Sequence, residues 1–507
     1  MSQRKKKKKI LFGPVITILI MTFVIMLASL IMSKLQLQGQ ITTIENGVLA
    51  SSLTIVNNIF TLEGLKFLFG NVLSNFQTFE PLVILIVALI GVSIGESSGL
   101  FDAVFKPLKR LNNKTMIAIT IFIGIISSII GDYNYLILIP LVGAIYSIID
   151  KNAYLGILTL FIGMTIGYGT GIIYNDLDYV MGNLTQISAS LEVDKNYTYG
   201  MFSNIYIMVA STIILTIIGT TLIDKFIVPR LPKYKKQERE ELVYSKKGLY
   251  LSNIIFVIIL AVIIYMIVPG FPNSGLLLDK NSTEYIDMLF GDASPFKSGF
   301  VYIVSVVLML CGYVYGKVSG NIKNTSEYSI GLSKSFSNVG FVFVLMFFTS
   351  QMISVLEWTN IGPVIVSSLT NLLASLPFSG IILIITFFII VIIMTFVMPS
   401  TLDKWALVSP LVVPLFMRAN ITPDFTLFIY KVADGVGKCF SPLFIYFLIM
   451  LAFLEKYNND ENYKVTVFGT IKSAMPVYLL MGALWILIIV CWYLIGLPSG
   501  IGTYPTL

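Results

Sequence analysis

The chain has 507 residues, of which 56% are hydrophobic and only 12% charged, and its mean hydropathy is +0.86. Apolar runs recur that are long enough to cross a hydrocarbon core of about 30 Å, which takes roughly 20 helical residues. The runs are continuous, as at 254–268 and 381–397, whereas strands of a membrane barrel alternate over about 10 residues. We therefore expect an all-α polytopic membrane protein.

Two residue counts exclude whole classes of function. The chain has no histidine and only three cysteines, all in apolar surroundings, so a zinc or di-iron enzyme has almost no ligands and a disulfide framework does not fit. The formal net charge of +7 is concentrated at the ends of apolar runs, where basic residues set membrane topology. We expect no metal, no cofactor and no nucleic-acid partner.

The N-terminus carries one arginine and five lysines, followed by an apolar run over 11–32. The run is too long for a signal peptide and lacks a small-residue cleavage site. We predict a first transmembrane helix with a cytoplasmic N-terminus, in an inner or plasma membrane. Residues 34–80 then form an external segment with an interfacial helix over 62–76, and 81–105 returns inward.

The stretch 116–149 is too long for one tilted span and carries Gly131-Asp132-Tyr133-Asn134 in its middle. We predict a re-entrant hairpin that enters from the cytoplasm and turns at Gly131 and Asp132. The run 154–174 then crosses outward, broken at 167–171, and a polar loop to Tyr199 lies outside. The run 204–226 returns to a basic cytoplasmic loop.

The second half repeats this scheme in the opposite orientation. Spans over 249–268, 301–315 and 339–356 precede a hairpin over 375–417, which enters from outside and turns at Pro399 and Ser400. The run 423–456 crosses inward with a break at 434–438, and 475–495 is the last span. The prediction is nine transmembrane helices and two re-entrant hairpins.

These features divide the chain into six parts: a basic N-terminus (1–10), the first span with its external segment (11–80), a first repeat (81–228), a connecting part (229–297), a second repeat (298–456), and a last loop and span (457–507). The tips Gly131 and Pro399 are separated by the same 268 positions as Gly167 and Gly435 (399 − 131 and 435 − 167). Equal offsets are typical of inverted-topology repeats, in which the substrate binds at the midplane between broken helices.

A helix broken at membrane depth leaves backbone polar groups unpaired unless they line a cavity or meet a ligand. The four breaks therefore predict the site of an alternating-access transporter. A channel would carry polar residues along whole helices, but here they cluster at the breaks. A membrane enzyme would have only a Ser–Lys pair such as Ser400 and Lys404, so we expect no enzyme.

Four stretches resemble one known family. They are GVSIGESSGL at 91–100, GDYNYLILIPL at 131–141, PSTLDKWALVSPLVVPLFM at 399–417 and TPDFTLFIYKVADGVGKCFSPL at 422–443. In order, spacing and residue type they resemble the p-aminobenzoyl-glutamate transporter (AbgT) family over nearly the whole chain. The resemblance implies a homodimeric inner-membrane carrier in the lipid bilayer, for uptake of p-aminobenzoyl-glutamate or efflux of sulfonamide antimetabolites. A dicarboxylate carrier of related fold is the alternative.

Carried over by position, the resemblance implies a substrate site formed by Asp178, Trp405, Pro423, Lys431, Asp434 and Pro442. An aroyl-glutamate has two carboxylates and an aromatic amine, so it needs a cation, a helix N-terminus and an aromatic face. Ser400 or Thr401 caps the helix beginning at Leu402, Trp405 supplies the ring and Lys431 the charge. The family has arginine at this last position, and lysine lacks its bidentate fork.

The resemblance also implies a sodium-type site, but its four positions here hold Thr395, Pro399, Asp434 and Lys438. An ammonium group near a bound ion adds repulsion of about 4 kcal/mol at 4 Å for an effective dielectric of 20. We hypothesise that Lys438 replaces the ion by pairing with Asp434, which makes transport proton-coupled or uncoupled rather than sodium-coupled. The alternative is an inert structural ion pair, although intramembrane charges usually mark function.

Overall fold

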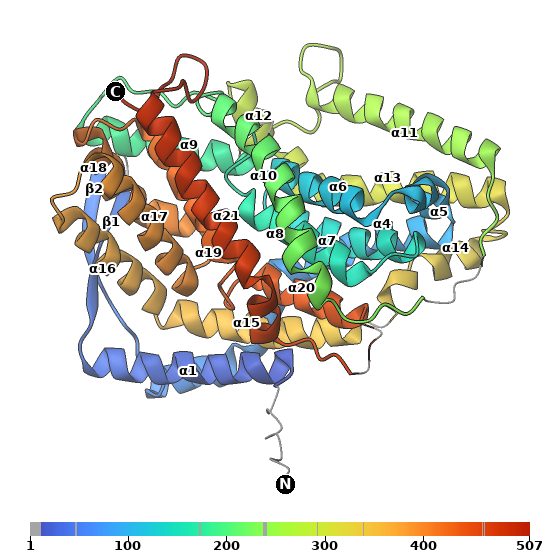
Figure 1. Cartoon of the computed structure of the whole chain (residues 1–507), viewed down its shortest axis with the longest axis horizontal. Coiled ribbons are helices and arrows are strands. Elements are labelled where there is room, and N and C mark those ends of the chain that lie inside the picture. The colour runs from blue at the N-terminus through green and yellow to red at the C-terminus, as the bar shows by residue number, and fades with distance from the viewer. Residues whose placement is uncertain are drawn as a thin grey trace, which may run out of the picture.

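The computed structural model describes residues 12–45, 48–171, 174–236, 241–291, 293–337, 339–458, 460 and 462–507. Within them the protein is helical, with one small β-hairpin (Figure 1). Eight stretches are long and apolar enough to span a membrane: Pro14–Lys34 (α1), Val72–Ser97 (α3 and α4), Ile205–Arg230 (α10 and the turn after it), Lys246–Ile267 (α11), Pro295–Ser319 (α13), Gly340–Trp358 (α15), Gly380–Val397 (α17) and Val467–Ile495 (α21). The all-α polytopic class is confirmed.

Seven of these stretches coincide with predicted spans, and the eighth, α17, is the first arm of the second predicted hairpin. The first hairpin consists of α6 (Asn113–Ile126), a 3-10 turn (Ser127–Ile130) and α7 (Tyr133–Ile148). Gly131 turns it with φ 60° and ψ −149°, a combination that is essentially restricted to glycine. The first broken helix then follows as α8 (Ala153–Ile166) and α9 (Asp176–Glu192).

The second repeat has the same elements in the same order: α17, α18 (Thr401–Arg418), α19 (Pro423–Lys438) and α20 (Ile445–Lys456). Helices α7 and α18 begin 268 positions apart (133 and 401), α8 and α19 begin 270 apart (153 and 423), and α9 and α20 begin 269 apart (176 and 445). This near-constant offset extends the predicted repeat from two pairs of residues to whole helices.

Two predicted irregular segments differ from the structure. Helix α19 continues through the predicted break at 434–438, and the interruption lies at 439–444. Gly435 does not bend the helix; it lets α19 approach α8 so closely that a Cβ there would lie 2.3 Å from the Thr165 carbonyl oxygen. The predicted polar loop up to Tyr199 contains α9, whose first turn is capped by Asn175 accepting from the Asp178 amide.

The external segment is also more ordered than the sequence predicted. Strands β1 (Gln38–Glu45) and β2 (Val48–Ile55) pair antiparallel, and the interfacial helix over 62–76 is two helices, α2 (Leu62–Gly70) and α3 (Val72–Gln77). Helix α16 (Ile361–Ser375) was not predicted, and the Ser367 hydroxyl donates to the Gln40 carbonyl at 2.5 Å. The remaining helices are α5 (Leu100–Phe105), α12 (Tyr285–Phe290) and α14 (Thr325–Gly331), with 3-10 turns at Lys106–Arg110, Val228–Arg230 and Lys334–Phe336.

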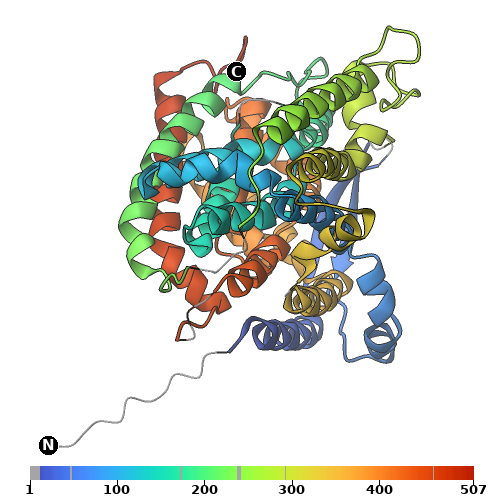
Figure 2. The ribbon, with the colours of Figure 1, turned by 90° about the vertical axis from the view of Figure 1, so that its right-hand side faces the viewer.

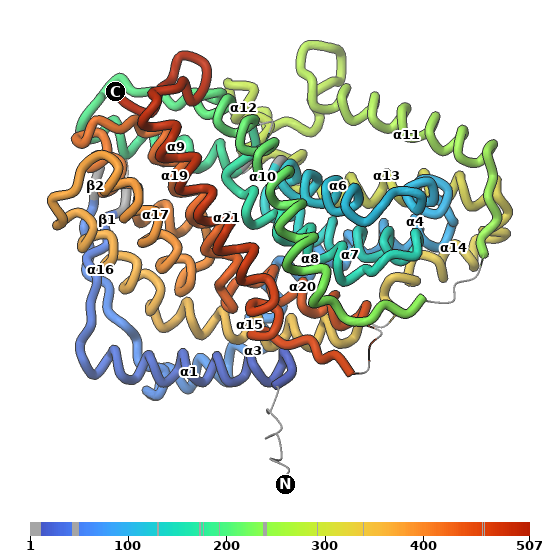
Figure 3. Tube along the Cα trace, in the orientation of Figure 1, coloured from blue at the N-terminus to red at the C-terminus, as the bar shows by residue number. Residues whose placement is uncertain are grey.

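Helices α8 and α19 lie in the interior, and α1, α10, α11 and α21 are more exposed. Helix α1 runs along the lower edge in Figure 1 and is seen nearly end-on at the bottom of Figure 2, and α11 lies at the upper edge in both. Helices α10 and α21 pack side by side across one face, and the trace in Figure 3 passes from α1 directly into the β-hairpin. Every residue of α8 and α19 is buried, so any polar side chain on them needs a partner inside the protein.

Charged residues gather where the first hairpin begins and ends. Asp150, just after α7, pairs with Lys109 and, at 3.2 Å, with Lys236. These two ammonium groups, Lys109 above all, hold the pKa of the Asp150 carboxyl below its ordinary value. The base of the hairpin therefore lies at a polar boundary, whereas its tip lies inside.

Candidate functional site

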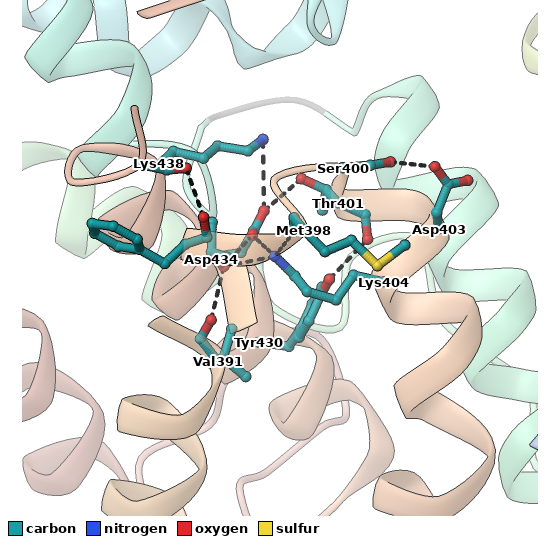
Figure 4. Close-up of polar contacts among 12 residues, drawn as sticks. Val391, Met398, Ser400, Thr401, Asp403, Lys404, Tyr430, Asp434 and Lys438 are labelled. Carbon is teal, nitrogen blue, oxygen red and sulfur yellow. Dashed lines mark hydrogen bonds and ion pairs between the residues drawn. The ribbon is translucent and has the colours of Figure 1, made fainter. Parts of the chain in front are cut away.

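Asp434 on α19 is the centre of a buried polar cluster. Its side chain is 0% exposed. Its Oδ1 accepts from the Thr395 hydroxyl at 2.8 Å and from the Lys404 ammonium at 2.5 Å, and its Oδ2 accepts from the Thr401 hydroxyl at 2.5 Å (Figure 4). A buried carboxylate needs such partners. The cluster joins three elements of the second repeat, because Thr395 lies on α17 and Lys404 on α18.

The Lys404 ammonium is the first of two cations in this cluster. Besides Asp434, its Nζ lies 2.6 Å from the Thr395 hydroxyl oxygen and 3.0 Å from the Met398 carbonyl oxygen. Its side chain is 0% exposed. Three oxygens, one of them from the hairpin tip, thus surround a monovalent positive charge. From the sequence, Lys438 is the residue predicted to replace the ion, and Lys404 enters only as part of a Ser–Lys pair.

Lys438 is the second cation of the cluster, and it is bound more loosely. Its Nζ lies 3.6 Å from Asp434 Oδ2 and 3.9 Å from Asp132 Oδ1, and 3.4 Å from the centre of the Tyr168 ring. Within the described residues its ammonium makes no hydrogen bond. The hypothesised Lys438–Asp434 pair is therefore present, with a cation–π contact as further support. Because Asp132 is at the tip of the first hairpin, Lys438 connects the two repeats.

A cavity of about 390 Å³ opens at the hairpin tips beside this cluster. Four carboxylates face it, and the described residues that line it include no lysine or arginine: Glu80, Pro81, Asp132, Ile353, Leu356, Glu357, Gly362, Pro363, Val397, Met398, Pro399, Ser400, Asp403, Phe444, Ile445 and Tyr446. The Ser400 hydroxyl donates to Asp403 at 2.6 Å rather than accepting from a helix amide. Ser400 thus lines the cavity without the expected capping bond, and helix α18 begins at Thr401, one residue earlier than expected.

The other residues expected at the substrate site lie elsewhere. Trp405 is fully buried, with its ring centre 4.5 Å from that of Tyr430, and its Nε1 donates to the Thr185 hydroxyl at 3.1 Å. It therefore packs in the core and does not face the cavity. Pro423 is the buried first residue of α19, and Pro442 lines a second, apolar cavity.

Asp178 and Lys431 are both predicted to bind substrate. In the structure they form an ion pair with each other between α9 and α19, and both side chains are buried. No sequence signal relates these residues, which are 253 positions apart. Lys404 could have been found from helical spacing, since it follows Thr401 by three positions on α18 and therefore shares its face. Among the described residues, no group of acidic or sulfur side chains is placed to hold a metal ion.

Two re-entrant hairpins, two broken helices and a charge cluster between them define a membrane transporter built from inverted repeats. The chain belongs to the family described as the AbgT putative transporter family, whose model matches residues 6–507.

Three relatives show the extent of this similarity. The p-aminobenzoyl-glutamate transport protein of Escherichia coli (strain K12) is 25% identical over 459 residues, covering 89% of this chain and 87% of the relative. The crystal structure of the Alcanivorax borkumensis YdaH transporter covers 97% of this chain and 100% of its own, at 22% identity and a TM-score of 0.49. Neisseria gonorrhoeae MtrF, described within a class of antimetabolite efflux pumps, covers 98% of both chains at 25% identity and a TM-score of 0.49.

Proposed function

We propose that this chain is a secondary active transporter that moves a small aromatic molecule by alternating access and is not driven by sodium. The observation that carries the proposal is the Lys404 ammonium, enclosed by the oxygens of Asp434, Thr395 and Met398. A sodium ion would have to displace a tethered charge of the same sign or bind beside it, at a repulsion of about 4 kcal/mol at 4 Å.

Proton coupling follows from the same arrangement. The Asp434 carboxylate binds the first turn of α18 through hydrogen bonds from Thr401 and Lys404. It binds the end of α17 through a hydrogen bond from Thr395. Loss of a proton from Lys404 would remove the positive charge that binds Asp434 and so loosen the hairpin tip from α19, because the two ammonium groups around Asp434 favour its ionised form. If the pair instead stays closed throughout the cycle, transport is uncoupled, and a pH gradient does not drive it.

The cavity favours one of the two substrate classes. p-Aminobenzoyl-glutamate carries two carboxylates, which would face Glu80, Asp132, Glu357 and Asp403, and a dicarboxylate meets the same repulsion. A sulfonamide is an aromatic amine with at most one weakly acidic group, and Phe444 and Tyr446 offer ring faces for it. We therefore propose efflux of sulfonamide-type compounds as the principal activity, with p-aminobenzoyl-glutamate as a weaker substrate.

We further propose, from the family resemblance and the basic residues at 4–9, a homodimer in the inner or plasma membrane with a cytoplasmic N-terminus. The exposed apolar length of α11, of which Tyr250 and Val257 are examples, is available to lipid or to a second copy.

The test is flux of labelled sulfonamide and p-aminobenzoyl-glutamate in vesicles containing the purified protein. A pH gradient is imposed with sodium or with choline as the external cation, and Asp434→Asn serves as the inactive control. We expect sulfonamide flux that follows the pH gradient and is equal in both salts. A strict sodium requirement would refute the proposal for Lys404.

A further inference from the structure

The second cavity, of about 600 Å³, is separate from the acidic one and lies between α1, α17 and the start of α21. We call it the α1 groove. Its lining residues are Phe12, Thr17, Ile20, Met21, Val24, Ile25, Phe396, Pro442, Leu443, Thr466, Phe468 and Gly469. The side chains of Val24, Phe396 and Phe468 are exposed, so the groove opens on the outer surface of the protein.

The α1 groove presents hydrocarbon and almost no free polar group. Among the described residues that line it, the only polar side chains are two threonines, and both are already bonded within the chain. The Thr17 hydroxyl donates to the Gly13 carbonyl at 3.0 Å, and the Thr466 hydroxyl accepts from the Gly469 amide at 3.1 Å. A polar solute would lose its hydration here without compensation, whereas an apolar chain gains from burial.

Positive charge marks one end of the α1 groove. Lys464 and Lys472 are exposed and flank the lining segment 466–469, and Lys472 follows Phe468 by four positions, on the same face of α21. In the sequence, Arg4 and the lysines at 5–9 precede Phe12 by a few residues. Basic residues of this kind attract anionic lipid headgroups at a membrane surface.

The length of the α1 groove matches one leaflet. From Phe12 to Ile25 the lining follows α1 for about 20 Å at 1.5 Å per residue, and half of a hydrocarbon core is about 15 Å. We propose that the groove binds an anionic phospholipid, with an acyl chain along α1 and the phosphate against Lys464 and Lys472.

This lipid would contact the second hairpin and the interruption of the second broken helix, which the proposed function requires to move. Pro442 and Leu443 lie in the interruption between α19 and α20, and Phe396 is on the first arm of the second hairpin. The Ser441 hydroxyl donates to the Phe396 carbonyl at 3.4 Å, so the two parts adjoin. Pro442, expected from the family resemblance to contact substrate, therefore contacts a lipid chain in this proposal.

The test uses tryptophan fluorescence of the full chain in vesicles that contain matched fractions of dibrominated phosphatidylglycerol or dibrominated phosphatidylcholine. Val24→Trp places a reporter in the α1 groove, and Ile217→Trp places one on the exposed face of α10 as the control; the signal of the unsubstituted protein is subtracted. We expect dibrominated phosphatidylglycerol to be favoured over dibrominated phosphatidylcholine at the groove by about fivefold or more, with equal quenching by both lipids at α10.

A second comparison tests the headgroup contact. Lys464→Gln together with Lys472→Gln in the Val24→Trp background should remove the preference. Lys246→Gln together with Lys247→Gln removes two charges at the start of α11 instead and should leave it unchanged. Equal quenching by the two lipids in Val24→Trp, or a preference that survives Lys464→Gln with Lys472→Gln, would overturn the proposal.

Discussion

The Lys431 ammonium and the Asp178 carboxylate form an ion pair in the interior, between one repeat and the other. Lys431 lies on α19, and Asp178 lies in the first turn of α9, where the helix amides also favour a negative charge. Each residue thus satisfies the other's charge, and the pair fastens the first broken helix to the second.

Removing one partner should destabilise the protein more than removing both. Lys431→Met leaves the buried Asp178 carboxylate unpaired, and Asp178→Asn leaves the buried Lys431 ammonium without a counter-charge. For Lys431→Met we expect the free energy of unfolding to fall by about 3–5 kcal/mol. The double variant should recover much of that loss. Thermal unfolding of the detergent-solubilised protein measures all three. Single variants that keep the normal melting temperature but lose transport would instead favour a direct contact with substrate.

Lys404→Ala should create a sodium site. Without the ammonium, Asp434, Thr395 and the Met398 carbonyl retain their oxygens around an empty position, which suits a hard cation. We expect sodium chloride to raise the melting temperature of Lys404→Ala relative to choline chloride and to leave that of the unsubstituted protein unchanged. At a sodium concentration 100 times Kd the stabilisation is about 2.7 kcal/mol. Lys438→Ala, with Lys404 intact, is the matched control and should not respond. A sodium response in the unsubstituted protein would contradict the prediction.

The sequence predicts the positions of both hairpin tips, because each tip contains a residue whose backbone conformation is unusual or restricted. Gly131 has a positive φ, and Pro399 cannot continue the α17 hydrogen-bond ladder. The break in the second broken helix was predicted five residues too early, because the polar segment 434–438, with Gly435 and Gly437, resembles a helix interruption. Both are helical, and both serve close packing, against Thr165 and Thr395 respectively.

The centre of the site could be predicted, but its pairing could not. Asp434 and Lys438 share a helix, so their spacing is visible in the sequence. The bond between Lys404 and Asp434 joins residues 30 positions apart on different helices, and it depends on how α18 packs against α19. For the same reason the sequence did not distinguish a Trp405 ring facing substrate from one packed on Tyr430.

Gly435→Ala tests the close approach of α19 and α8. A methyl group there would overlap the Thr165 carbonyl oxygen, at 2.3 Å, and the Tyr168 Cβ, at 2.7 Å. Because the obstacle is backbone, we expect the two helices to move apart, which lowers the free energy of unfolding by about 1–3 kcal/mol. We expect the variant to remain folded but to transport much more slowly. Gly340→Ala is the control, since no described atom lies within 4 Å of the position that its Cβ would take and its φ is not positive. If Gly435→Ala and Gly340→Ala have the same stability and the same transport rate, the close α8–α19 contact is not required for transport.

Removing charge from the cavity should change substrate preference. Glu357 and Asp403 both line it and carry like charges, and each costs a substrate carboxylate about 1 kcal/mol at 4 Å in a water-like dielectric. Glu357→Gln together with Asp403→Asn should therefore lower the KM for p-aminobenzoyl-glutamate by about 20-fold or more, and the side-chain amide introduced by Asp403→Asn can still accept the hydrogen bond from Ser400. The KM for a neutral sulfonamide should stay the same, because it carries no charge for these residues to repel. Glu63→Gln, an exposed substitution on α2 outside the cavity, controls for net charge. If p-aminobenzoyl-glutamate transport is unchanged or weaker in the double variant, the acidic cavity is not where its carboxylates bind, and the preference for sulfonamides must be decided elsewhere.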